Sequence, residues 1–146
     1  MEVETRTDCG MRAEVSRRCR TVEECYEFML AYAAQGLANE DGQSGSQIRE
    51  VLQRAVDALS TLAEVGFTAA DDLPCPAEKY LAFLDVLDRD ADDSIRTIEL
   101  VLAQPTISSQ MIDNLNASVH LRTVLTDLFL LGDIVRRPVP VASSTR

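Results

Sequence analysis

The sequence predicts an all-α protein, most simply a four-helix bundle in an up-and-down arrangement or with one crossover. Apolar residues recur every three or four positions in four long segments, which is the spacing of one helix face. The turn formers Gly and Pro number only 6 and 5 in 146 residues, and aromatic residues make up 5%. This length and composition indicate one soluble globular domain with few strands.

The chain is expected to divide into an arm, a body and a tail. Residues 1–20 have no clear apolar period and mix both charges, so we expect a flexible N-terminal arm with at most one short helix at 11–19. Residues 21–136 carry the helical patterns and form the predicted bundle domain. Residues 137–146 contain two prolines among small polar residues and predict a disordered tail.

The first expected helix begins at Thr21, which forms a capping box with Glu24. Its apolar face runs through Val22, Cys25, Met29 and Tyr32. No charged residue occurs from Phe28 to Asn39, so we expect this helix to be covered on most sides.

The second expected helix begins at a capping box of Ser44 and Gln47 and ends near Val65, with Gly66 as its C-cap. A single apolar stripe predicts that its other side faces solvent; the stripe consists of Ile48, Val51, Leu52, Ala55, Leu59, Leu62 and Ala63. The link at 66–75 is long enough for either a folded loop or a crossover, so the topology is open.

The third expected helix keeps one apolar phase from Ala77 to Gln104, where Pro105 stops it. Four aspartates crowd its middle, at positions 88, 90, 92 and 93. Because Asp disfavours a helix interior, a kink or break near residue 90 is the alternative to one long helix.

The fourth expected helix, residues 111–135, organises the bundle. A narrow polar stripe runs along it and predicts one solvated face, made of Ser109, Asp113, Asn116, His120, Thr123 and Asp127. Beyond Leu128 the polar face almost vanishes, so one bundle cannot cover all its apolar surface. We therefore expect a homodimer or larger even oligomer, with an interface at Leu128, Leu130, Leu131 and Ile134.

The segment 88–99 resembles the calcium loop of the EF-hand family over 12 residues. The resemblance implies Asp88, Asp90 and Asp92 as monodentate ligands and Glu99 as the closing bidentate ligand. Asp93 stands where the family has Gly, and no partner loop is present in the sequence. Because the apolar period crosses the segment without a phase shift, we favour a solvated acidic face on a helix, with calcium binding as the alternative.

Three polar residues are candidates for a site in the bundle interior. Arg122 falls within the apolar arc of the fourth helix, which predicts an ion pair buried in the bundle or between subunits. His120 is the only histidine, and Ala117 stands where a di-iron Glu-x-x-His motif requires Glu, so that metal site is excluded. Tyr32 completes a ligand-binding alternative; we predict no cofactor and favour no metal.

The charge distribution and the cysteine spacing indicate which partners and which cellular compartment to expect. Residues 21–135 hold twenty acidic residues against six basic ones, within a net charge of −10, and such a body repels phosphate backbones. We expect no nucleic-acid partner and, since no long apolar run or secretory signal occurs, no membrane. The four cysteines form no C-x-x-C pair, which predicts reduced thiols and a cytoplasmic location.

The absence of a catalytic motif from the sequence favours a non-enzymatic interaction protein that acts as a homodimer, adaptor or regulator. Two alternatives remain open. One is a calcium-binding protein that uses residues 88–99. The other is a ligand- or cofactor-binding bundle, enzymatic or not, that uses the interior around Arg122, Tyr32 and His120.

Overall fold

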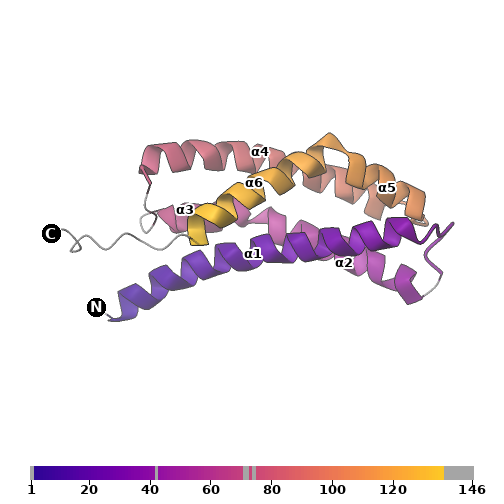
Figure 1. Ribbon diagram of the computed structural model, residues 1–146, viewed down its shortest axis with the longest axis horizontal. Coiled ribbons are helices and arrows are strands. Elements are labelled where there is room, and N and C mark those ends of the chain that lie inside the picture. The colour runs from indigo at the N-terminus through magenta and orange to yellow at the C-terminus, as the bar shows by residue number, and fades with distance from the viewer. Residues whose placement is uncertain (1, 42, 71–72, 74, 137–146) are drawn as a thin grey trace.

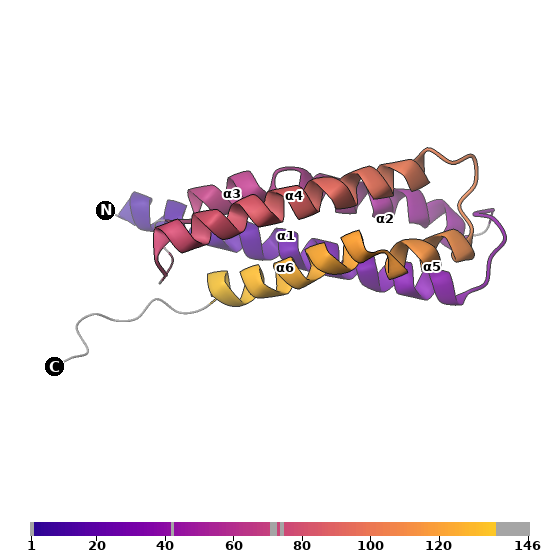
Figure 2. The ribbon, with the colours of Figure 1, turned by 90° about the horizontal axis from the view of Figure 1, so that it is seen from above.

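All regular structure in the described part of the chain is helical, which confirms the predicted class. The computed structural model describes residues 2–41, 43–70, 73 and 75–136, and the predicted tail at 137–146 lies outside them. Six helices occur in these ranges: α1 (Glu2–Ala34), α2 (Gln43–Ser60), α3 (Leu62–Thr68), α4 (Ala77–Leu102), α5 (Ser109–Ala117) and α6 (Val119–Arg136). They make four passes of alternating direction, with α2 and α3 forming the second pass and α5 and α6 the fourth (Figures 1 and 2).

The predicted N-terminal arm is instead the first half of α1, which runs without interruption from Glu2 to Ala34. Val15 and Cys19 are fully buried and extend the apolar stripe of Val22 backwards by two turns. The expected capping box is absent, because the Thr21 hydroxyl donates to the Arg17 carbonyl inside the helix, 3.0 Å away. α1 therefore crosses the expected boundary at residue 20.

The core lies between the four passes. α1 packs against α2 and against α5 and α6, while α4 packs against α2, α3 and α6. The guanidinium of Arg12 joins the start of α1 to the end of α6 by donating to the Val135 carbonyl at 2.7 and 3.0 Å. The bulkiest fully buried side chains are Tyr32, Met29, Ile48, Leu52, Leu59, Leu62, Leu87, Ile98, Ile107, Ile112, Leu128 and Leu131.

The helix breaks occur where the sequence did not predict them. α4 is continuous from Ala77 to Leu102, so its central aspartates cause no break near residue 90. The second pass breaks at Thr61 instead, and the expected C-cap Gly66 lies inside α3. The fourth pass breaks at Ser118, whose φ of −60° and ψ of 135° are extended rather than helical.

A polar network fastens one end of the molecule. Arg49 on α2 pairs with Glu40 by two hydrogen bonds of 2.6 and 2.7 Å and also donates to the carbonyls of Leu102 and Gln104. Glu40 in turn accepts from the Ile107 amide at 3.0 Å. These bonds tie the loops at 35–41 and 103–108 together, so this end is structurally satisfied rather than open.

Candidate functional site

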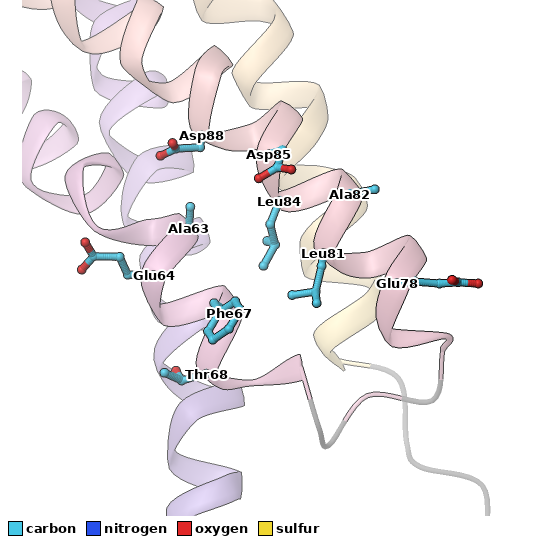
Figure 3. Close-up of a pocket in the computed structure, with 10 residues that line it drawn as sticks. All are labelled: Ala63, Glu64, Phe67, Thr68, Glu78, Leu81, Ala82, Leu84, Asp85 and Asp88. Carbon is cyan, nitrogen blue, oxygen red and sulfur yellow. The ribbon is translucent and has the colours of Figure 1, made fainter.

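A hollow with a volume of about 890 Å³ lies on the surface between α3 and the first half of α4. Its floor is apolar: Leu81 and Leu84 on α4 approach Phe67 on α3 (Figure 3). The Phe67 side chain is 62% exposed in this hollow. Ten residues line what we call the α3–α4 groove: Ala63, Glu64, Phe67, Thr68, Glu78, Leu81, Ala82, Leu84, Asp85 and Asp88.

A close approach of α3 to α4 shapes the bottom of the groove. The Tyr80 hydroxyl donates to the Gly66 carbonyl at 2.7 Å. A Cβ at Gly66 would lie 3.0 Å from Leu84 Cδ2 and 3.2 Å from the Tyr80 oxygen. Glycine at this position therefore lets the two helices touch, and burial raises the pKa of Tyr80 to about 12, so its hydroxyl remains a donor.

Four carboxylates surround the apolar floor, namely Glu64, Glu78, Asp85 and Asp88, and no basic residue lines the groove. All four are exposed, and none forms an ion pair in the described part of the chain. The groove therefore combines an exposed aromatic ring with four carboxylates that form no ion pair in the described part of the chain, and the guanidinium of Arg89 donates to the Asp85 carbonyl at 3.3 Å.

A second polar feature lies inside the α4–α6 contact. Asp127 on α6 is only 8% exposed, and its Oδ2 has no hydrogen-bond partner within the described residues. Burial, together with the hydrogen bond and charge of the neighbouring Asp90 carboxyl, raises the pKa of Asp127 to about 7. Asp127 therefore keeps its proton up to near neutral pH, and this proton lies in the hydrogen bond between the two carboxyls.

The three candidates for an interior site do not come together. Arg122 is exposed, because the break at Ser118 turns α6 so that Arg122 faces solvent. It therefore forms no ion pair buried within the bundle, while an ion pair between subunits stays a prediction. His120 is also exposed. Tyr32 is fully buried and donates from its hydroxyl to the Ile107 carbonyl at 2.6 Å, so it serves the polar network described above.

The EF-hand-like segment lies wholly within α4, so it has the geometry of a helix rather than of a calcium loop. Its four candidate ligands point in different directions. Asp88 lines the groove, Asp90 contacts Asp127, and Asp92 pairs with Arg96 at 3.1 Å. Glu99 is exposed and lies about two helical turns beyond Asp92.

Of the four predicted interface residues, two cannot reach a second subunit. Leu128 and Leu131 are fully buried within one chain, because the first half of α1 covers the face of α6 that the sequence left unpartnered. Ile134 is half-buried. Leu130 is 52% exposed beside Phe129, which is 53% exposed, so these two residues form the outward apolar surface in the C-terminal half of α6.

Sequence reasoning missed Phe67 and the Asp90–Asp127 pair. Phe67 sits in a short stretch that reads as a link, and no periodicity marks a seven-residue helix. The signal that was present is local: a large aromatic residue directly follows Gly66, and carboxylates recur at 78, 85 and 88 on one side of α4. Asp127 offered no such signal, since its partner lies 37 positions away in the chain.

Comparison with known proteins assigns neither a family nor a function to this chain. No protein-family model, curated protein or solved structure matches the chain. Across the described residues, no three His, Cys, Asp or Glu side chains lie close enough to hold a metal ion together. None of the helices in this part of the chain is both long and apolar enough to cross a membrane.

Proposed function

We propose that this chain is a non-enzymatic interaction protein that binds a segment of a partner protein in the α3–α4 groove. The proposal treats the molecule as one four-helix bundle, in which α2–α3 and α5–α6 are each one broken helix. The observation that carries it is Phe67, a large apolar side chain left 62% exposed inside a hollow rather than on a convex surface.

An exposed aromatic ring in a hollow has the properties of a binding hot spot. Burying a Phe side chain contributes about 2–3 kcal/mol, and pockets that accept an apolar group concentrate binding energy at such rings. The bond from the Tyr80 hydroxyl to the Gly66 carbonyl, with the close approach at Gly66, holds α3 against α4 at the floor. A partner would therefore meet a preformed surface.

We also propose a cytoplasmic location for this interaction. Cys19, Cys25 and Cys75 are free thiols, and burial raises the pKa of the first two. Two buried, unpaired thiols support a reducing compartment.

A displayed library of random peptides tests the function without assuming the partner. We expect selection on wild-type protein to enrich sequences that no longer bind Phe67→Ser. Phe129→Ser is the matched control, because Phe129 is similarly exposed, at 53%, but lies on α6 outside the groove. Enrichment of no peptide that depends on Phe67 would refute the proposal.

Self-association is the second candidate function, and Phe129 with Leu130 is the observation that favours it. These adjacent side chains are the exposed apolar part of the C-terminal half of α6. A two-fold axis beside α6 would bring both pairs together and cover them. Sedimentation of wild-type protein as a monomer at tens of micromolar would exclude this candidate.

A further inference from the structure

No basic residue lines the α3–α4 groove, and this distinguishes it from the other hollow described on the surface. That second hollow, between α1 and α2, contains its own counterions: Glu14 pairs with Arg17 and with Arg18, the latter at 3.0 Å. In contrast, the four carboxylates of the α3–α4 groove have no basic neighbour among its lining residues.

The carboxylates lie on both sides of the apolar floor. Glu78, Asp85 and Asp88 are spaced by seven and three positions, so they share one side of α4 over about 15 Å. Glu64 stands on α3 across the groove (Figure 3). Phe67, Leu81 and Leu84 point into the space between α3 and α4, while the side chains of Glu64 and Glu78 lie at its outer edges and point away from it (Figure 3).

We propose that the occupant of the groove is a basic amphipathic helix of about three turns, with apolar side chains against Phe67, Leu81 and Leu84 and Arg or Lys beside the carboxylates. The inference rests on the proposed function, since it names the chemistry of the partner at that same site. Charge complementarity to the acidic lining favours a partner with positive charge. The acidic row on α4 is about 15 Å long, which corresponds to about ten residues of a bound helix.

Negative charge on both sides of an apolar floor favours this partner in two ways. It attracts a cationic segment over a distance of about one Debye length, roughly 8 Å at physiological salt, and it repels acidic amphipathic helices of equal apolar area. Affinity for the true class of partner must therefore fall as salt rises. An apolar ligand without charge would bind independently of salt.

Three synthetic helical peptides of about 14 residues test this chemistry. They share one apolar face and carry Arg and Lys, or Gln, or Glu at the flanking positions. Fluorescence anisotropy at about 50 mM and about 300 mM salt measures their affinities. We expect the basic peptide to bind about tenfold more tightly than the Gln peptide at low salt, with a loss of about tenfold at high salt.

Variants of the protein test whether the peptide binds in the groove. The double substitution Glu64→Gln with Asp85→Asn should lower the affinity of the basic peptide about tenfold and leave the Gln peptide unaffected. Asp93→Asn is the matched control, because Asp93 is an exposed acid of α4 that does not line the groove. Phe67→Ser should abolish binding of both, with circular dichroism confirming an intact fold.

The outcomes separate this inference from the proposed function. The proposal of a cationic partner would be overturned if the Gln or Glu peptide bound as tightly as the basic one. It would also be overturned if the double substitution left the affinity of the basic peptide unchanged. The function would still stand if library peptides depended on Phe67. Absence of any peptide that depends on Phe67 would overturn both.

Discussion

The Asp90–Asp127 pair should make the stability of the protein fall as the pH rises towards neutrality. The pKa of Asp127 is raised from 3.8 to about 7 in the folded chain, chiefly by burial. Between these two values the folded state holds a proton that the unfolded state has lost, so the free energy of unfolding decreases as pH increases. The stabilisation is complete below about pH 4 and gone above about pH 7.

The size of the effect follows from the shift. The shift of about three units of pKa corresponds to about 4 kcal/mol, of which about half is lost between pH 5 and pH 7. Asp90 is only half-buried, and water at its carboxyl screens the repulsion between the two charges. We therefore expect wild-type protein to lose about 2 kcal/mol from this pair between pH 5 and pH 8.

Asp127→Asn isolates the contribution. The amide keeps the shape of the carboxylic acid, carries no charge, and can donate to Asp90 as the shared proton does. Urea unfolding followed by circular dichroism at pH 5, 6, 7 and 8 should give nearly equal stabilities at pH 5. At pH 8 the variant should be more stable by about 2 kcal/mol. Asp113→Asn, at an exposed acid of α5, controls for the change in net charge.

The difference between variant and wild type is the quantity to plot, because other carboxylates titrate as well. The hydrogen bond from Arg49, in particular, lowers the pKa of Glu40, and its stabilisation is lost as pH falls below the ordinary range of Glu. That contribution cancels in the difference. A difference that stays constant from pH 5 to pH 8 would refute the argument for a shared proton.

Three further substitutions test the burial described above. Arg122→Ala should change the free energy of unfolding by less than about 0.5 kcal/mol, because the guanidinium is exposed; a denaturation midpoint well below wild type would contradict this. Leu131→Asp should unfold the protein, whereas Leu130→Asp should remain helical by circular dichroism and, if α6 forms a dimer, sediment as a monomer. Gly66→Ala should cost about 1–2 kcal/mol in urea unfolding, because the new methyl group lies 3.0 Å from Leu84 Cδ2; unchanged stability would show that α3 shifts freely.

Helical periodicity predicted the elements that are uninterrupted and half-buried. In α4, the expected stripe from Tyr80 to Ile98 is buried, and the phase carries through the aspartates. The same rule identified Ile48 and Leu52 on α2. Such segments bury one face against one neighbour, so sequence spacing alone determines which side chains enter the core.

The first half of α1 was missed because its buried face is narrow and its flanks are charged. Val15 and Cys19 are four positions apart, and Arg17 and Arg18 lie between them in the sequence. Without knowledge of the helix that covers Val15 and Cys19, this pattern predicts a flexible arm. The partner is α6, whose end accepts the hydrogen bonds of Arg12. Surplus apolar surface on α6 was thus a signal for a longer α1 as much as for a dimer.

Arg122 and Asp127, two of the polar residues that sequence reasoning misplaced, were assigned to the wrong environment for one physical reason. Spacing assigns faces only while the backbone stays helical, and one extended residue at Ser118 changes the direction of every later side chain relative to α5. The Ser94 hydroxyl, buried on α4, donates to the His120 carbonyl at 2.9 Å just after this break. The bend is therefore held by a contact between α4 and α6 that no local pattern encodes, and with it Asp127 is turned towards Asp90 while Arg122 is turned to solvent.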